Sequence, residues 1–344
     1  MKQTTFGKTA EGTEASLYTI CNSKGMRAMV TNFGATLVSV FVKNRNGEDT
    51  DVILGYDDVA DYQKNTCYVV GRNCNRIANA KFTINGVEYQ LEANDNENSL
   101  HSGSNGTSER FWNVISCTDQ MITLQIEDAD LQQGYPGNAV IQVTYEVTED
   151  NGLAITYHAK ADKDTVFNFT NHAYINLNGH ASGSVLDQTL QIKASHFTPV
   201  KDGKAIPTGE LADVEGTPFD FRIAKPIGRD INAENDQLKY GSGYDHNFAL
   251  DHTGNGVEKV ATAYAPESGI QMEVYTDCPG MQFYSANFIQ GQKGKGGVTY
   301  KEREAFCLET QYFPNSVNEP NFQSPITAAG KDYASKTIYK FSIA

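Results

Sequence analysis

Apolar and polar residues alternate along many stretches of this chain, which is the pattern of strands with one buried and one solvated face. Residues 122–127 and 141–147 follow this period, and residues 153–157 and 270–274 repeat it. The pair Asn151-Gly152 separates two of these runs and tolerates the positive φ of a tight turn. We therefore predict an antiparallel hairpin around this pair.

Helical patterns are scarce by comparison. Residues 57–63 predict a turn or two of helix, and no window of about fifteen residues carries a sustained apolar stripe at helical spacing. The strand pattern is interrupted neither by a fixed-period repeat nor by a Pro/Ser-rich linker. We predict an all-β fold of large antiparallel sheets packed face to face, with residues 1–344 as a single domain, although a two-sandwich arrangement stays open.

Composition narrows the possible partners. The formal net charge of −14 disfavours the phosphate backbone of nucleic acids and anionic membrane surfaces, so a neutral small molecule fits better. Residues 1–20 lack the apolar stretch and cleavage site of a secretory signal, and no run approaches membrane-spanning length. We expect a cytoplasmic protein. The cysteines have no CxxC spacing and are expected to be reduced, with neither disulfides nor a zinc site: Cys21, Cys67, Cys74, Cys117, Cys278 and Cys307.

Residues 168–177 combine an apolar face with hydrogen-bonding groups. Read as a strand, the segment places His172, Tyr174 and Asn176 on one face and apolar side chains on the other. Such a strand suits the wall of a polar cleft, and it equally suits a solvent-facing edge.

Two carboxylates stand out. Glu309 lies within an apolar run, where an ionised carboxylate is costly unless it has a partner, so we expect either a structural ion pair or a functional group there. Asp245 and His246 fall on opposite faces of a strand, so only one of them readily addresses a cleft, and we favour Asp245. The alternative is that Asp245 serves a turn after the preceding glycines.

Other polar groups are ambiguous by themselves. Residues 71–77 supply Arg72 and Arg76 with neighbouring asparagines, which bind sugar hydroxyls or carboxylates. His101 lies beside small residues, in a site loop or in a surface loop. The glycine-rich residues 291–297 do not match a phosphate-binding loop, and we predict a flexible loop. The remaining histidines are expected to be structural, and none forms a metal-binding HxxxH pair: His158, His180, His196 and His252.

Taken in order, several blocks resemble the aldose 1-epimerase (galactose mutarotase) family over most of the chain. They are GRNCNRIANAKFTINGVEYQL from Gly71, NSLHSG around His101, NFTNHAYINLNG around His172, GYDHNF around Asp245, PGMQFYSANF around Gln282 and CLETQYFPNSVNEPNFQSP around Glu309. The resemblance implies a supersandwich of large antiparallel sheets, free hexoses and pentoses as substrates, and no requirement for a metal or nucleotide.

The resemblance also implies roles for single residues. Glu309 matches the general base that takes the proton of the anomeric hydroxyl, and His172 matches the general acid that protonates the ring oxygen. His101 matches a second histidine that polarises this oxygen. The implied sugar-binding residues are Asn75, Arg76, Asp245 and Gln282. The preferred aldose stays open, as does the choice between a monomer and a homodimer.

Three departures from the family pattern, Cys278, Ser102 and Cys74, bear on sugar preference more than on the reaction. Among alternatives, a hexose-6-phosphate 1-epimerase needs basic residues that the net charge disfavours. A non-catalytic carbohydrate-binding protein is favoured if Glu309 or His172 is missing, and both are present. A glycosidase needs a carboxylate pair, for which Asp245 and Glu309 are candidates, and only the order of the blocks favours isomerisation.

Overall fold

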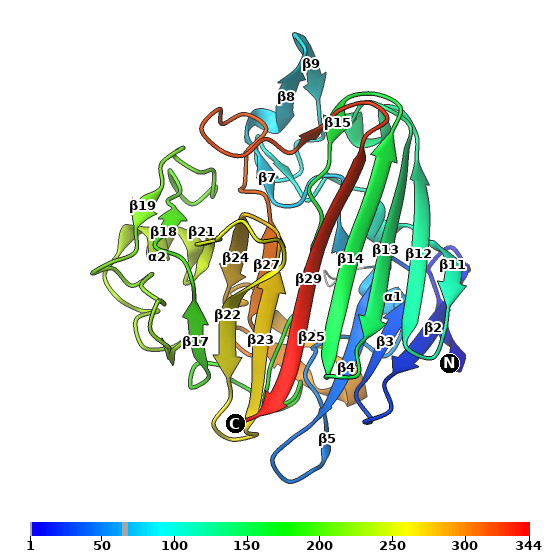
Figure 1. Cartoon of the computed structure of the whole chain (residues 1–344), viewed down its shortest axis with the longest axis vertical. Coiled ribbons are helices and arrows are strands. Elements are labelled where there is room, and N and C mark those ends of the chain that lie inside the picture. The colour runs from blue at the N-terminus through cyan, green and yellow to red at the C-terminus, as the bar shows by residue number, and fades with distance from the viewer. Residues whose placement is uncertain (1, 64–67) are drawn as a thin grey trace.

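A long antiparallel sheet forms one layer of the molecule (Figure 1). The computed structural model describes residues 2–63 and 68–344, and within these residues this sheet has nine strands. In spatial order they are β11 (Asn113–Cys117), β12 (Met121–Asp128), β13 (Ala139–Val147), β14 (Gly152–Ala161), β29 (Asp332–Ile343), β23 (Ile270–Thr276), β22 (Glu258–Tyr264), β17 (Thr189–Ile192) and β20 (Lys225–Pro226). The predicted hairpin is confirmed: Val147 pairs with Leu153, and Asn151 has a φ of 61°.

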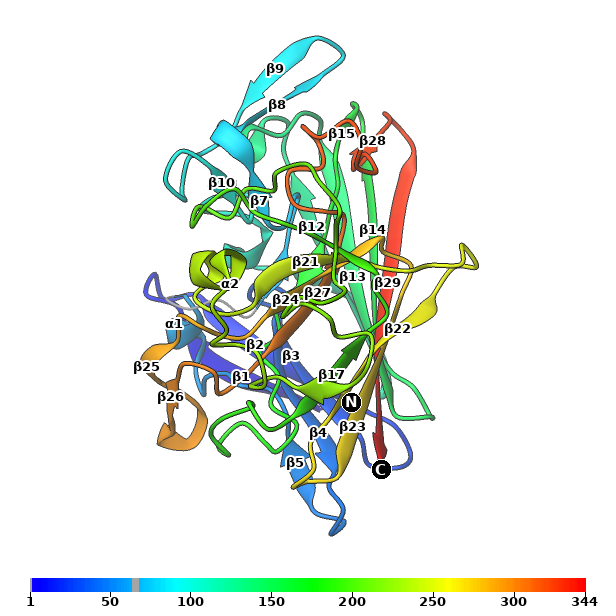
Figure 2. The same cartoon turned by 90° about the vertical axis from the view of Figure 1, so that its left-hand side faces the viewer.

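Two smaller sheets form the facing layer, as the side view shows (Figure 2). The first contains β1 (Lys2–Lys8), β2 (Glu14–Cys21), β3 (Arg27–Thr31), β4 (Leu37–Lys43) and β5 (Asp49–Asp51). The second, in the order β19, β18, β21, β24 and β27, contains Ala212–Asp213, His196–Thr198, Asp245–Ala249, Gly280–Tyr284 and Cys307–Gln311. One apolar cluster runs between the layers because the alternating residues of both turn inward.

The layers also meet through polar contacts at the centre of the long sheet. The Tyr339 hydroxyl of β29 donates to the Leu308 carbonyl of β27 at 2.8 Å, and the Thr310 hydroxyl of β27 contacts that of Thr337. These contacts fix which side of β27 faces the core. The expectation of an all-β fold of large antiparallel sheets is confirmed.

Short elements complete the described part of the chain. The paired short strands are β6 (Val69–Val70) with β16 (Thr170–Asn171), β7 (Arg76–Ile77) with β10 (Ser99–Leu100), β8 (Lys81–Ile84) with β9 (Val87–Gln90), β15 (Thr165–Val166) with β28 (Ile326–Thr327), and β25 (Gln290–Lys293) with β26 (Thr299–Lys301). Four 3-10 turns span Ala78–Ala80, Thr107–Glu109, Gln132–Gly134 and Lys295–Gly297. The predicted helical turn is α1 (Val59–Tyr62), capped by the Asp58 carboxylate. A second helix, α2 (Asp236–Gly241), is capped by Asn235 and is too short to show a periodic stripe.

The prediction of a flexible loop at residues 291–297 was wrong. This segment contains most of β25 and a 3-10 turn, and its Lys295 is buried. The Lys295 ammonium donates to the Asp51 carboxylate at 2.7 Å and to the Val38 carbonyl at 2.8 Å. A buried, satisfied charge therefore attaches this hairpin to the first sheet.

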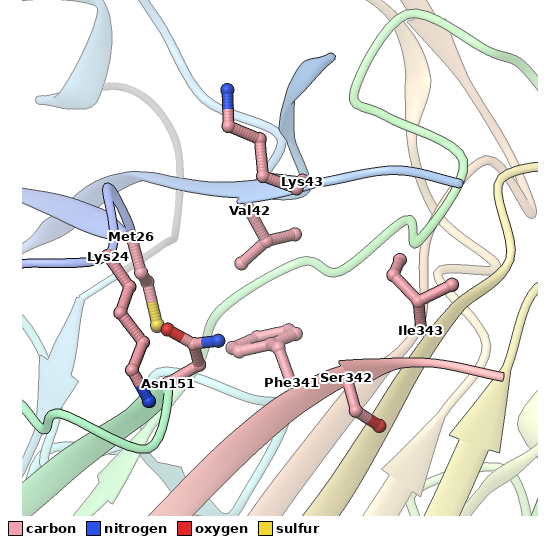
Figure 3. A pocket seen from close by; sticks show the side chains of 8 residues that line it. All are labelled: Lys24, Met26, Val42, Lys43, Asn151, Phe341, Ser342 and Ile343. Carbon is pink, nitrogen blue, oxygen red and sulfur yellow. The ribbon is translucent and has the colours of Figure 1, made fainter. Parts of the chain in front are cut away.

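A small surface pocket lies where β4 approaches the end of β29 (Figure 3). Its cavity is about 90 Å³, and it is lined by Lys24, Met26, Val42, Lys43, Asn151, Phe341, Ser342 and Ile343. As far as the described residues go, none of the predicted site residues lies there.

Two composition-based expectations can be compared with the described residues. Five cysteines are free thiols among the described residues, and Cys67, the sixth cysteine that was expected to be reduced, lies outside them. No helix in the described ranges has the length and apolar character needed to cross a membrane.

Candidate active site

The polar face of β21, β24 and β27 forms the floor of the candidate site. In this antiparallel register Gln282 lies between Asn247 and Glu309, and Tyr284 lies between Asp245 and Cys307. Side chains alternate along each strand, so their neighbours Phe283 and Leu308 point into the core. Three distant segments thus bring Asp245, Gln282 and Glu309 into one pocket lining.

The prediction that Asp245 and His246 lie on opposite faces of the strand, with Asp245 facing the cleft, is confirmed. Asp245 faces the pocket, whereas His246 is buried with its ring 4.6 Å from that of Phe219. The His246 Nδ1 accepts the Asp245 amide, which helps hold the backbone at this position.

The roof comes from β7, β10 and the turns beside them. Asn75 and His101 both adopt positive φ, at 60° and 54°, and this turns their side chains toward the cavity. The His101 amide donates to the Asn75 carbonyl at 3.1 Å, so the two turns support each other. Arg76 reaches the pocket while its Nε donates to the Asp95 carboxylate at 2.7 Å.

Floor and roof enclose a cavity of about 270 Å³, the scale of a small polar ligand. All seven predicted site residues line it: Asn75, Arg76, His101, His172, Asp245, Gln282 and Glu309. The lining also includes Leu100, Tyr174, Tyr284, Phe288, Ile289 and Gln292. The structure therefore brings together the seven residues that the family resemblance placed in the site.

Glu309 is a buried carboxyl group, and no described residue of opposite charge forms a hydrogen bond with it. It is 2% exposed, and its Oε2 has no hydrogen-bond partner among the described residues. Its Oε1 lies 3.7 Å from the His172 Nε2, longer than a hydrogen bond. Burial raises the pKa of Glu309 well above its usual value, and the nearby Asp245 adds to this rise. Of the two alternatives for Glu309, a functional group fits better than a structural ion pair, because its Oε2 is left open to a ligand.

His172 is buried opposite this carboxyl group. Burial lowers the pKa of its imidazole to about 4. The ring stacks on Tyr174 with 5.0 Å between centroids, and its Nδ1 lies 3.5 Å from the Cys307 Sγ. Burial thus lowers the pKa of His172 and raises the pKa of Glu309, so it favours the neutral form of both groups.

His101 is held in one tautomer. Its Nδ1 accepts the Asn75 amide at 3.1 Å, and a main-chain amide only donates, so the neutral ring carries its proton on Nε2. Burial lowers the pKa of His101 well below its usual value, helped by the nearby His172 and Arg76. His101 is therefore a neutral hydrogen-bond donor.

The tautomer of His101 also affects whether this site can bind a metal ion. One donor atom each of His101, His172 and Glu309 lies within 4.8 Å of the others, a cluster that local sequence spacing did not reveal. A metal ligand must offer a lone pair. The Nδ1 lone pair of His101 is occupied by the Asn75 amide, and its Nε2 carries the proton. The donor set does not fit a metal in this arrangement.

A chain of amides lies behind the floor. The Gln282 Nε2 donates to the Asp245 carboxylate at 2.7 Å, and the Gln311 Nε2 donates to the Gln282 Oε1 at 3.4 Å. The Cys74 thiol in turn contacts the Gln311 Oε1 at 3.3 Å. Gln282 is thereby oriented with its amide nitrogen toward Asp245. Burial raises the pKa of Asp245, and Arg76 opposes this rise.

The three departures from the family pattern lie outside the lining. Ser102 accepts the Asn73 amide at 2.8 Å and secures the roof from behind. The Cys278 carbonyl contacts His252 at 2.7 Å. Cys74 alone connects to the pocket, through Gln311.

Two residues grouped with the candidates lie elsewhere. Arg72 is buried, and its Nε donates to the Asp128 carboxylate at 2.6 Å, so it supports the fold. Asn176 was placed on the His172 face, but the segment does not continue as a strand beyond β16. Its Nδ2 donates to the carbonyls of Gly183 and Glu304. The four histidines expected to be structural are absent from the described lining.

Sequence reasoning missed Tyr284 and Cys307. Each lies two residues from a predicted site residue, Gln282 or Glu309, and shares its face. The alternation of strand residues therefore contained a signal for both. Phe288 and Gln292 follow β24 in a connecting segment and its hairpin, where no period marks them.

Comparison with known proteins agrees with this geometry. The family model described as aldose 1-epimerase matches residues 16–340. The chain is 36% identical to the aldose 1-epimerase of Escherichia coli K12 over 336 residues, covering 96% of each protein. It is 39% identical to the galactose mutarotase of Homo sapiens over 326 residues, covering 93% of this chain and 92% of that protein.

Solved structures agree as well. An aldose epimerase homologue from C. elegans superposes with a TM-score of 0.88 at 29% identity, covering 96% of this chain and 99% of that one. The galactose 1-epimerase of Lactobacillus acidophilus gives a TM-score of 0.85 at 28% identity, covering 100% and 98%. With its fold, its pocket and its sequence all in agreement, this chain belongs to the aldose 1-epimerase family.

Proposed function

We propose that this chain is an aldose 1-epimerase that interconverts the α and β anomers of free aldoses, such as galactose and glucose. The observation that carries the proposal is the buried Glu309–His172 pair, 3.7 Å apart, in which burial raises the pKa of the carboxyl group and lowers that of the imidazole. Anomer exchange needs one proton removed from a hydroxyl and one delivered to the ring oxygen. A carboxyl group and an imidazole that trade a single proton suit this task.

Ring opening conserves the proton count of the pair. The Glu309 carboxylate takes the proton of the anomeric hydroxyl, the C1–O5 bond breaks with its electrons on O5, and O5 takes a proton from the His172 imidazolium. The products are the open-chain aldehyde, a protonated Glu309 and a neutral His172. This is the protonation state that burial favours in the empty site. Rotation about C1–C2 and the reverse transfers then close the ring as the other anomer.

The cyclic sugar needs the ionic form of the pair, and its own hydroxyls help to create it. The Glu309 Oε2 lacks a hydrogen-bond partner among the described residues, so a sugar hydroxyl that donates there stabilises the carboxylate. The His101 Nε2–H donates toward the ring oxygen and stabilises the negative charge that develops on it. Sugar binding therefore shifts the Glu309–His172 pair toward the ionic form that opens the sugar ring.

The remaining predicted residues orient the sugar. Asp245 accepts hydroxyl protons with the oxygen not taken by Gln282, while Asn75, Arg76 and Gln282 bind the other hydroxyls. A ring fixed by these contacts presents O1 to Glu309 and O5 to His172.

Charges in the pocket favour a free sugar over a sugar phosphate. Among the described lining residues Arg76 is the only Lys or Arg, and it already pairs with Asp95. Asp245 and Glu309 repel a phosphate when ionised. A hexose-6-phosphate 1-epimerase is therefore disfavoured.

We further propose that residues 1–344 act as one catalytic domain in the cytoplasm. Support for one domain comes from the spread of the site over residues 75–309 and from a core cluster that extends from Tyr18 to Phe341. Support for the compartment comes from the five free cysteines, which are typical of a reducing environment.

The function is tested by polarimetry on freshly dissolved α-galactose, α-glucose and α-xylose, with galactose 6-phosphate and glucose 6-phosphate run in parallel. We expect faster mutarotation of the free sugars and little effect on the phosphates. The exposed-residue variant His158→Gln serves as the matched control and should behave like wild type. Equal rates with and without protein would refute the proposal, and a preference for the phosphates would favour the sugar-phosphate enzyme.

Asp245→Asn is expected to raise the KM for free aldoses by about 10- to 100-fold, because a hydrogen bond to a charged acceptor contributes roughly 1.5–3 kcal/mol. The kcat should fall less, since the proton-transfer pair is intact. Steady-state polarimetry measures both constants. An unchanged KM would show that Asp245 does not bind the sugar.

A further inference from the structure

Cys307 lies directly behind the imidazole of His172. It is fully buried on β27, two residues before Glu309 and on the same face. Its Sγ lies 3.5 Å from the His172 Nδ1, while the His172 Nε2 faces Glu309 on the other side of the ring. Cys307 is absent from the pocket lining, so it acts on a sugar only through His172.

The proposed reaction requires one tautomer of His172. Reclosure begins with a neutral ring whose Nε2 takes the proton of the O5 hydroxyl, so Nε2 must be bare at that moment. The proton of the neutral ring must then be on Nδ1, where it needs an acceptor. The sulfur of Cys307 is in place for that hydrogen bond.

We propose that Cys307 is a positioning residue whose sulfur accepts the Nδ1–H of His172 and leaves Nε2 free to exchange a proton with the sugar. The inference rests on the function proposed above. The opposite arrangement, with the thiol donating to Nδ1, places the ring proton on Nε2 and blocks reclosure. The tautomer of His172 decides between the two.

Sulfur is a weak hydrogen-bond acceptor. A weak acceptor at Nδ1 suits His172, because its Nε2 must both give a proton to the sugar and take one back. A carboxylate behind a histidine stabilises the imidazolium, as the aspartate does in the serine protease triad. A carboxylate at Nδ1 would stabilise the protonated form of His172 and so oppose the transfer of its proton to O5. The neutral thiol orients the ring without adding that bias.

Several other groups face His172 and can influence its protonation. Glu309 lies at Nε2, the His101 ring is 5.5 Å away, and Tyr174 and Tyr284 pack against the imidazole. A pH profile alone therefore does not isolate Cys307, and the test needs a direct measure of the tautomer.

The experiment compares wild type with Cys307→Ser and Cys307→Ala, each labelled with ¹⁵N at histidine, and assigns His172 by its loss in His172→Gln. Long-range ¹H–¹⁵N spectra at pH 7 report which ring nitrogen carries the proton, and polarimetry on the same samples gives kcat and KM. Cys117→Ala, on β11 of the long sheet, is the matched control.

We expect His172 to be protonated at Nδ1 in wild type and in Cys307→Ser, whose hydroxyl is also an acceptor. Cys307→Ala should mix the two tautomers and lower kcat by about 10-fold or more, as losing the partner of a functional histidine typically does. The KM should stay within about twofold because Cys307 does not line the pocket.

Nε2 protonation in wild type would overturn the inference, as would an unchanged tautomer in Cys307→Ala. Equal losses of kcat in the serine and alanine variants would also count against it. The spectra do not depend on turnover. If wild type failed to speed mutarotation, the proposed function would fall, while the Cys307–His172 hydrogen bond would still be tested.

Discussion

Glu309→Gln is expected to lower kcat for mutarotation by about 10²–10⁴-fold, the usual contribution of a positioned general base. The amide keeps the size of the side chain and cannot take a proton from the anomeric hydroxyl. Because the side chain is buried and its Oε2 has no described partner, the fold does not depend on its charge.

The same substitution should raise the free energy of unfolding at neutral pH. Burial raises the folded-state pKa of Glu309, so the folded protein keeps this proton at pH values where the unfolded chain has lost it. Stability of the wild type therefore falls as pH rises from about 4.3, the value of an unperturbed glutamate, toward the raised folded-state pKa. Glutamine is free of this loss, so we expect Glu309→Gln to be more stable than wild type at pH 8 and this gain to shrink at pH 5.

Urea unfolding at the two pH values, with polarimetry on the same preparations, measures both effects. The exposed Glu302→Gln is the matched control and should change neither. A Glu309→Gln variant that is inactive and also less stable at both pH values would indicate a structural role and contradict this account.

His172→Gln is expected to cause a loss of kcat of similar size, again about 10²–10⁴-fold, because His101, the other donor toward O5, is a neutral ring that polarises the oxygen without giving up its proton. The two residues act together in the same ring-opening step. The double variant Glu309→Gln/His172→Gln should therefore be only slightly worse than either single variant. Additive losses, measured by single and double variants side by side, would show that the two residues work independently.

On the acid side of the pH profile, kcat/KM should decrease as His172 becomes protonated. The active pair holds one proton, and below a pH of about 4 both groups are protonated, so no base remains. We expect kcat/KM of wild type to fall as pH drops through this value and the residual activity of His172→Gln to lack that decrease. Circular dichroism at each pH separates loss of activity from unfolding.

The fold was largely predictable because its signal is local. Ile122, Leu124 and Ile126 alternate with polar residues, and this period alone assigns β12 a buried and a solvated face. The same rule separates Asp245 from His246. The site residues were named through family resemblance, and the antiparallel register explains why Asn247, Gln282 and Glu309 end up side by side.

The predictions that failed have a common cause: the residues concerned contact residues that are distant in the sequence. The segment after His172 leaves the strand pattern because Ile175 bridges to both Ile53 and Phe306. Lys295 looked like part of a flexible loop because its partner Asp51 is 244 residues away. The sequence also left a structural ion pair open for Glu309, since nothing local indicates that this buried carboxyl group lines a pocket.

The alternation of the floor strands limits how this enzyme can change its sugar preference. Along the floor strands the side chains of the site alternate with buried residues, so an insertion or deletion in β27 would exchange Glu309 for Leu308 at the reaction centre. The segment from Phe288 to Gln292 borders the same cavity from a connection and a surface hairpin, where length and composition vary at little cost. New specificities are therefore best sought by diversifying that rim while leaving the strands untouched.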